Sequence, residues 1–303
     1  MEIHLFGITT STGQSFLRAL TLDSLSPIFY SYTRHPNDSL PFSHFCDLSS
    51  PRSFDLAGTS TDSQIWISFA PIWLFSDFFC SLVSLRPRLL DYLKGVIVCS
   101  SSSALTKRFA FNAFDRELAT RLKSAEDNLL ADCKLMSVNC SILRPSLIYG
   151  RVGSYRDSNI SLLISAMRRF PVLPLPMHSG LRQPIHASQL ASCFLHIARE
   201  LMTSCPDKPA FSCINVGGDS QLSYSSMIKS TQDLLQADDP ARNCRILLIP
   251  TKIFYFLSFF LLFKSSKHFE AALRICSNLS GFTPAHQITN SSPQRFPVLP
   301  LSD

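Results

Sequence analysis

Short apolar runs, each followed by small or polar residues, recur along the first half of the chain. The first run, Ile3 to Phe6, ends at Gly7, and a helical pattern begins at Gly13. A strand that passes through a tight glycine turn into a helix is the entry to a dinucleotide-binding βαβ unit. Such a helix N-terminus presents N–H groups and a positive dipole end to a pyrophosphate. The pattern predicts a cofactor turn at Gly7, Thr10 and Gly13, with Thr10 standing where the usual middle glycine would be.

The later apolar runs predict five more strands, each with a characteristic residue or pair near its end. These are Ile28 to Tyr32 with Arg34, a short strand with Asp47 and Leu48, QIWISFAPIW with Phe69 and Ala70, KGVIVCSSSS with Ser100 and Ser101, and VNCSILRPSLIYG with Tyr149. A helical pattern over Arg116 to Ala131 precedes the last strand. Nearly continuous apolar strands that alternate with helices are typical of a parallel sheet covered on both faces. The predicted fold class is α/β, a doubly wound parallel sheet of Rossmann type.

The character of the sequence changes after Gly150, where prolines cluster in FPVLPLPMHSGLRQPIH. Short strand and helix patterns follow without a recognisable linker. We therefore expect a dinucleotide-binding domain over residues 1–150. A smaller C-terminal substrate-binding portion over residues 151–303 would be interleaved with the sheet.

The segment Ile253 to Phe263 is apolar except for Ser258. As a helix it would reach about 16 Å, roughly half of a hydrocarbon core, so it is too short for a transmembrane span. A helix that is apolar all round is either buried or lies against an apolar partner. The sequence leaves three alternatives open: packing in the core, packing in a homodimer, or a peripheral membrane contact through this segment.

Composition narrows the function classes. Hydrophobic residues make up 46% of the chain and charged residues 17%, so a sizeable core can form. The net charge of +6 is scattered, and we expect no nucleic-acid partner. Histidines lack metal-ligand spacing, so no metal site is expected. The ten cysteines form no CxxC pair, and the chain enters a strand directly, which favours a cytoplasmic protein.

Arg34 lies about twenty residues beyond the glycine turn, where an NAD site would carry an acidic residue. A cation at this position suits the 2′-phosphate of NADP. The alternative is a solvated arginine at the end of a strand. We expect a nicotinamide dinucleotide cofactor, with NADP preferred over NAD.

Taken in order, the motifs resemble those of the extended or atypical short-chain dehydrogenase/reductases, in particular the NAD-dependent epimerase/dehydratase family. The motifs are GITTSTG, CDL, SFAP, VIVCSSSS, SAEDNLL, ILRPSLIYG, GLRQPIHASQLA and INVGG, followed by FTPAHQI. The resemblance covers nearly the whole chain, and its most specific motifs are LRPSLIYG and LRQPIHASQLA.

The resemblance implies roles for the matched positions. Gly7, Thr10 and Gly13 would hold the pyrophosphate, Asp47 and Leu48 would border the adenine, Phe69 and Ala70 would line the ribose side, and Ser100 and Ser101 would lie at the nicotinamide end. Arg182 would bind the diphosphate of a nucleotide-activated sugar, and Tyr149 would lie on the substrate side. Hydride transfer to and from the nicotinamide would then give epimerisation, dehydration or reduction.

One departure from the family concerns its chemistry. The family uses a tyrosine four residues before a lysine on the helix after the fifth strand, and the lysine lowers the pKa of the tyrosine. Alignment on Lys123 places Ala119 at the tyrosine position, whereas alignment on Glu126 places Leu122 and Leu118 at the lysine and tyrosine positions. Ser101 and Lys123 are therefore the candidate catalytic residues. The competing interpretation is a non-catalytic dinucleotide-binding scaffold or redox sensor.

Overall fold

The computed structural model describes residues 1–23, 27–36, 42–58, 62–156, 159–203, 209–263 and 265–300. It divides into two compact units, each built from three segments of the chain. The first unit contains Met1–Ala104, Thr120–Pro145 and Ala187–Asn215. The second contains Leu105–Ala119, Ser146–His186 and Val216–Asp303. The segment Ala187–Asn215 thus belongs to the first unit, although it lies beyond the boundary expected at residue 150.

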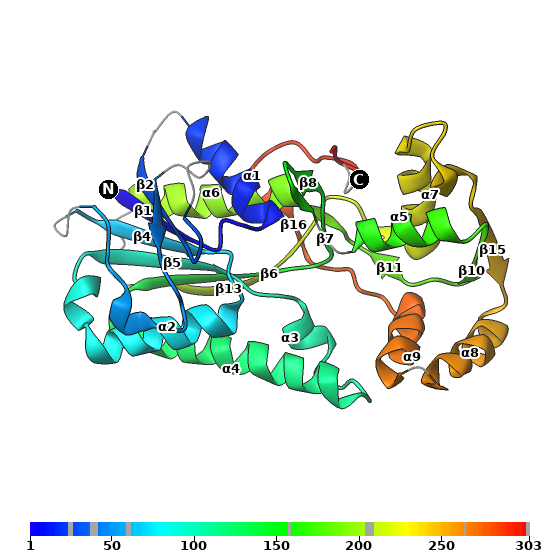
Figure 1. The fold of residues 1–303 in the computed structure, drawn as a ribbon, viewed down its shortest axis with the longest axis horizontal. Helices are drawn as coiled ribbons and strands as arrows, with labels where there is room; N and C mark the ends of the chain where they lie inside the picture. The colour runs from blue at the N-terminus through cyan, green and yellow to red at the C-terminus, as the bar shows by residue number, and fades with distance from the viewer. Residues whose placement is uncertain are drawn as a thin grey trace. The chain divides into compact units, whose positions relative to one another are not determined.

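The architecture is built on an eight-stranded sheet with the order β16-β13-β6-β5-β4-β1-β2-β3 (Figure 1). Its strands are β1 (Glu2–Phe6), β2 (Ile28–Thr33), β3 (Ser43–Phe45), β4 (Gln64–Ser68), β5 (Leu93–Cys99), β6 (Asn139–Pro145), β13 (Phe211–Gly217) and β16 (Thr283–Pro284). The pairs from β3 through β6 are parallel, and β13 also pairs with β16 in parallel. The order 3-2-1-4-5-6 is that of the doubly wound dinucleotide-binding fold. The predicted fold class is confirmed.

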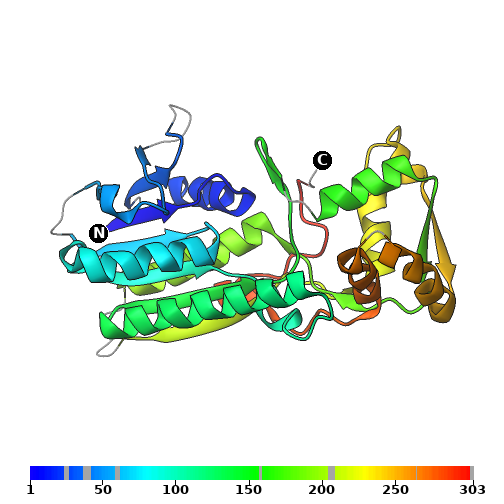
Figure 2. The same ribbon diagram turned by 60° about the horizontal axis from the view of Figure 1, so that its bottom comes forward.

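Helices cover both faces of this sheet in the first unit (Figure 1). They are α1 (Ser11–Thr21), α2 (Ile72–Leu85), α4 (Ala113–Leu135) and α6 (Ala187–Thr203). Helices α1 and α6 lie on one face, and Figure 2 shows α2 and α4 side by side over the other. Strands β1 and β4 are buried along their whole length because both faces are covered. Helix α6 joins this unit because Leu190, Cys193 and Phe194 are buried from solvent.

Short elements connect the larger ones. These are the 3₁₀ helices η1 (Pro51–Ser53) and η2 (Pro87–Leu90) and the single-turn helix α3 (Ser103–Thr106). Helix α4 begins in the second unit and continues into the first, because the division between the units falls after Ala119.

The second unit contains helices around small pairs of strands. The helices are α5 (Ile160–Arg169), α7 (Tyr224–Leu234), α8 (Thr251–Phe259), α9 (Ser266–Leu273) and α10 (Ala285–Thr289), with η3 (Pro240–Asn243), η4 (Phe260–Phe263) and η5 (Arg274–Cys276). The strand pairs are β7 (Ile148–Tyr149) with β12 (Ile185–His186), β8 (Arg151–Val152) with β9 (Tyr155–Arg156), β10 (Val172–Pro176) with β15 (Arg245–Ile249), and β11 (Leu181–Arg182) with β14 (Leu222–Ser223). Ile160, Ile164 and Met167 of α5 pack in a hydrophobic core with Met227 and Ile228 of α7.

Candidate functional site

The turn between β1 and α1 has room for no side chain at its two glycines. Gly7 has a φ of +71°, and a Cβ atom there would collide with the main chain of Ala70. A Cβ atom on Gly13 would lie 2.7 Å from Cα of Ile8. Glycine tolerates both the positive φ and the close approach. These two residues therefore hold the helix tightly against the strand, as a dinucleotide-binding turn requires.

Thr10 is the N-cap residue of α1, and its side chain accepts a hydrogen bond from one main-chain N–H group of the first turn. Its hydroxyl oxygen accepts a hydrogen bond from the N–H of Gly13 at 3.0 Å and lies 3.2 Å from the carbonyl oxygen of Gly7, to which it donates. This is the usual N-cap geometry. An anion at this helix N-terminus would then meet the N–H groups of Ser11 and Thr12. The turn thus has two tightly packed glycines and a capping hydroxyl at Thr10, where the usual dinucleotide-binding turn has its middle glycine.

The residues after the next two strands differ in exposure. Arg34, just after β2, is exposed. Asp47 is half-buried and its carboxylate accepts a hydrogen bond from the N–H of Ser49 at 3.0 Å, while the neighbouring Leu48 is also half-buried. Parallel strands place their carboxyl ends at one edge of the sheet, so these residues follow the same edge as the glycine turn.

Phe69 and Ala70 follow β4 and are both buried. The ring centre of Phe69 lies 5.4 Å from that of Phe16 in α1 and 4.7 Å from that of Phe194 in α6. Phe69 is therefore part of the packing between these two helices and the sheet. The main chain of Ala70, beside Gly7, is the part of this pair that closes the turn.

Ser100, directly after β5, belongs to a buried polar cluster with Glu126 of α4 and Arg144 of β6. The Ser100 hydroxyl donates to Glu126 Oε1 at 2.5 Å. Arg144 Nε donates to the same oxygen at 2.8 Å, and Arg144 Nη2 also donates to Glu126 Oε2. The Glu126 side chain is 0% exposed, and its hydrogen bonds raise the pKa of Arg144 above its usual value. A fork of two hydrogen bonds between arginine and carboxylate fixes both side chains in place.

Ser101 is half-buried, and its hydroxyl oxygen accepts a hydrogen bond from the N–H of Ser103 at 3.2 Å at the start of α3. Its hydroxyl lies outside the Ser100–Glu126–Arg144 hydrogen bonds.

The two expected substrate-side residues lie in the second unit and hold parts of the chain together. Arg182 is 4% exposed, donates to the carbonyl oxygens of Leu181, Ser277 and Arg274, and packs against the ring of Tyr224. Burial lowers the pKa of Arg182. Tyr149 is 1% exposed, and its hydroxyl accepts a hydrogen bond from the N–H of Val298 at 2.8 Å.

Comparison with solved structures shows which known proteins share this fold. The chain is similar to a human epimerase family protein solved with NADPH, at 11% identity and a TM-score of 0.63 over 98% of this chain and 96% of that one. It is similar to UDP-glucuronic acid 4-epimerase from Bacillus cereus in complex with NAD, at 13% identity and a TM-score of 0.63 over 97% and 92%. UDP-N-acetylglucosamine 4-epimerase from Bacillus cereus gives 12% identity and a TM-score of 0.59 over 97% and 94%.

The chain shares the α/β fold of these solved structures, although its sequence is at most 13% identical to theirs. No protein-family model matches it, and no curated protein does either. The expected resemblance to the NAD-dependent epimerases and dehydratases is confirmed at the level of the fold.

Within this fold, the structure favours one of the two registers for α4. Lys123 points away from the sheet, with a side chain that is 51% exposed and forms an ion pair with Asp127. Glu126, by contrast, points into the Ser100–Arg144 cluster, four residues after the buried Leu122. The alignment on Glu126 therefore matches the inward face of the helix. In that register Leu122 and the half-buried Leu118 take the positions of the lysine and tyrosine.

Glu126 and Arg144 lie in the motifs SAEDNLL and ILRPSLIYG, but no role was predicted for the pair. Arg144 lies in an apolar strand, where a buried charge needs a partner. Glu126 lies among the polar residues of SAEDN, so the sequence does not indicate that its carboxylate is buried or that it pairs with Arg144.

Two further observations concern absences. Within the described part of the chain, no three His, Cys, Asp or Glu side chains gather as metal ligands would. None of the described helices combines the length and apolar character needed to cross a membrane.

Proposed function

We propose that the first unit binds a nicotinamide dinucleotide and that the protein lacks the tyrosine-dependent chemistry usual for this fold. The inward face of α4 carries this proposal. Leu118, Ala119 and Leu122 occupy the positions at which either register would need a proton donor or its lysine partner. None of these side chains can transfer a proton or lower the pKa of a neighbour.

The bound cofactor would supply hydride acceptance and return at its nicotinamide ring. The turn with Gly7, Thr10 and Gly13 would hold the pyrophosphate, because its helix N-terminus offers N–H groups to an anion. Arg34 would pair with a 2′-phosphate, which favours NADP over NAD. Asp47 and Leu48 would border the adenine, with Ala70 and Ser100 along the same edge of the sheet.

The ligand on the substrate side would be a nucleotide-activated sugar, the class named for the two Bacillus cereus epimerases. Arg182 and Tyr149 would contribute to the substrate site indirectly, by holding the segments of the second unit around it. The guanidinium and the phenol are engaged with main-chain groups of the second unit, so we assign them to positioning the surrounding segments.

A second candidate is a slow enzyme in which Ser101 transfers the proton. Its position directly after β5, half-buried and outside the Glu126 cluster, favours this candidate. Lys123 would have to act from the solvent-facing side of α4. General acid–base groups contribute about 10²–10⁴ in rate, so such an enzyme would turn over weakly.

Titration of the purified protein with NADPH and NADH tests the binding proposal. Ser11→Asp would place a carboxylate at the first turn of α1. There the carboxylate interacts favourably with the helix dipole, but it would repel a pyrophosphate. We expect saturable binding by the parent and at least about tenfold weaker binding by the variant. Ser226→Asp, in the first turn of α7, adds the same charge elsewhere and should bind as the parent does. No saturable binding of either cofactor below millimolar concentration would refute the proposal.

The chemistry is tested separately by incubating the protein with each cofactor and a panel of UDP-hexoses. We expect weak or absent turnover from a protein that binds cofactor. Weak turnover that Ser101→Ala abolishes without changing cofactor affinity would support the second candidate instead.

A further inference from the structure

The segment 251–263, which consists of α8 and η4, projects large apolar side chains into solvent. We call it the apolar segment. The exposed side chains, with their exposed fractions, are Ile253 (50%), Tyr255 (42%), Phe256 (67%), Leu257 (47%), Phe259 (51%), Phe260 (54%), Leu261 (36%), Leu262 (38%) and Phe263 (83%). Exposed apolar patches of this kind mark interaction sites in soluble proteins.

Only one line of α8 faces the protein. Phe254 and Ser258 are 7% and 4% exposed, and they lie four residues apart on the same side of the helix. The Ser258 hydroxyl donates to the carbonyl oxygen of Phe254 at 2.7 Å. Burial of the apolar segment in the core of this chain, one of the predicted alternatives, is therefore wrong.

A second group of exposed aromatic side chains lies beside α9. Phe109, Phe111 and Phe114 are 80%, 92% and 56% exposed. Lys267 of α9 holds its ammonium 4.0 Å from the ring centre of Phe114. We call the apolar segment together with these three phenylalanines the docking surface.

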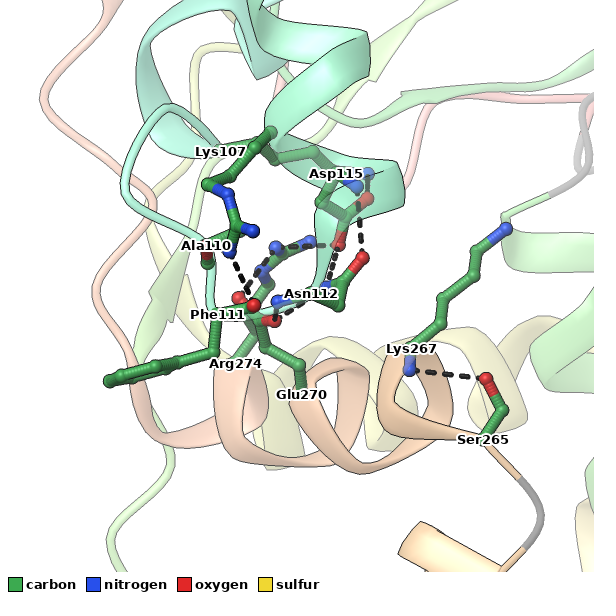
Figure 3. A network of polar contacts seen from close by, with 10 residues as sticks. Lys107, Ala110, Phe111, Asn112, Asp115, Ser265, Lys267, Glu270 and Arg274 are labelled. Atoms are coloured by element: carbon green, nitrogen blue, oxygen red, sulfur yellow. Dashed lines mark hydrogen bonds and ion pairs between the residues drawn. The ribbon is translucent and has the colours of Figure 1, made fainter.

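Figure 3 shows polar contacts that join the loop before α4 to helix α9 and the residues just after it. The carboxylate of Glu270 in α9 accepts hydrogen bonds from the main chain and the side chain of Asn112. Arg274 donates to Asp115 Oδ2 at 2.8 Å and to Glu270 Oε1 at 3.2 Å. Helix α9 in turn packs against α8 and η4. These contacts hold the loop before α4 and the apolar segment in a fixed arrangement.

The exposed charged side chains of α8 and α9 next to the apolar segment include Lys252 and Lys267. The carboxylates of Glu270 and Asp115 nearby are paired with Arg274 and Lys107. In the sequence, residues 240–269 contain no Asp or Glu. A cluster of basic residues next to an apolar helix is typical of segments that bind anionic lipid headgroups. The same charges disfavour a symmetric contact with a second copy, because a two-fold axis would bring the patch opposite itself.

We propose that the protein binds the surface of an anionic lipid bilayer through the docking surface. Helix α8 has nine residues and spans about 13 Å, so it would lie in the interface plane instead of crossing the bilayer. The phenylalanine and leucine side chains enter the acyl boundary, and the basic residues meet the headgroups. This proposal does not depend on cofactor binding, which concerns the first unit.

Co-sedimentation of the full chain with two kinds of vesicle tests the proposal. One is phosphatidylcholine alone, and the other is phosphatidylcholine with about one third phosphatidylserine. We expect binding to the anionic vesicles that is at least about tenfold stronger and that weakens as salt is raised. Each basic residue near the surface contributes about fivefold to this partitioning. Lys252→Glu should therefore lower binding by more than fivefold, since it also adds a repelled charge.

The apolar contribution is tested by replacing Phe259 and Phe260 with serine together. Both side chains are about half exposed, so the thermal midpoint should not fall while vesicle binding is lost. A matched control replaces Leu162 and Phe170 with serine. Leu162 lies in α5 and is 68% exposed, and Phe170 follows α5 and is 50% exposed. The control should bind vesicles as the parent does.

Three results would overturn the proposal. Equal binding to neutral and anionic vesicles would remove the electrostatic argument. Binding lost equally in the control would show that general hydrophobicity is responsible. A dimer seen by sedimentation velocity, abolished by the double Phe259 and Phe260 replacement in a protein that ignores vesicles, would identify a second copy as the occupant.

Discussion

The inward face of α4 carries two carboxylates, about three turns apart, and the stretch between them is apolar. Asp115 accepts from Lys107 Nζ at 2.8 Å, Asn112 Nδ2 at 2.9 Å and Arg274 Nη2 at 2.8 Å. Glu126 accepts from Ser100 and Arg144. Both buried carboxylates of α4 are thus paired with hydrogen-bond donors. The positions that the resemblance assigns to the tyrosine and the lysine carry Leu118 and Leu122 in one register and Ala119 and Lys123 in the other.

Removing Glu126 should give the largest effect on stability. Glu126→Ala leaves Arg144 buried without its carboxylate, and breaking a buried pair costs about 3–5 kcal/mol. Chemical denaturation measures the loss. Lys123→Ala, which removes the surface pair of the same helix with Asp127, should cost about 0–1 kcal/mol. Similar losses from the two variants would mean that the buried cluster adds nothing beyond a surface pair.

Filling the apolar stretch tests which register matters for chemistry. Leu118→Tyr combined with Leu122→Lys restores the tyrosine–lysine pair in the Glu126 register. We expect turnover of UDP-hexoses to rise by about 10²-fold or more, because general acid–base catalysis is typically of that size. Ala119→Tyr, which uses the existing Lys123, is the matched variant and should gain less. A larger gain from Ala119→Tyr would show that the structure favours the wrong register.

The stabilisation that ionised Asp115 provides can be measured from the pH dependence of the free energy of unfolding. Burial by itself raises the pKa of Asp115, but hydrogen bonds from Asn112 and Lys107 and the charges of Lys107 and Arg274 outweigh it. They lower the pKa from 3.8 to about 2. Because the folded pKa lies below the unfolded one, this stabilisation is present above about pH 4 and is lost as pH falls toward 2. It amounts to about 2 kcal/mol.

The difference in free energy of unfolding between the parent and Asp115→Asn should therefore become smaller as the pH is lowered from 6 to 2. Asp127→Asn is the control, since the Asp127 side chain is 55% exposed. A difference that stays constant over this range would show that ionised Asp115 does not stabilise the fold.

The smallest expected effect concerns cofactor choice at the other end of the sheet. Arg34 is exposed after β2, and one charge-assisted contact with a 2′-phosphate is worth about 1–2 kcal/mol. NADPH should bind more tightly than NADH by about five- to thirtyfold, and Arg34→Asp should reverse the preference. Isothermal titration of both cofactors with both proteins measures the ratio. Equal affinities in the parent would mean that Arg34 does not contact the cofactor.

The sheet and its first glycine turn were predictable because their signals are local. Buried parallel strands are continuous apolar runs, and a glycine turn is marked by the glycines themselves. The site residues were harder because their partners are distant in sequence. Arg182 looks like a phosphate ligand in its motif, yet Ser277 and Arg274, more than ninety residues away, receive its hydrogen bonds. Leu122 and Lys123 are adjacent, and they are distinguished only in the structure, where Leu122 is buried and Lys123 is exposed.

The connectivity of the chain also limits how such a protein can evolve. The backbone passes between the two units after residues 104, 119, 145, 186 and 215. No single truncation can delete either unit and leave the other whole, because each is assembled from three separated stretches. Substitutions at positions 118 and 122 that remove a reaction therefore leave the second unit in place. The docking surface, which consists of α8, η4, Phe109, Phe111 and Phe114, is then retained whether or not the protein catalyses a reaction, and selection can act on it independently.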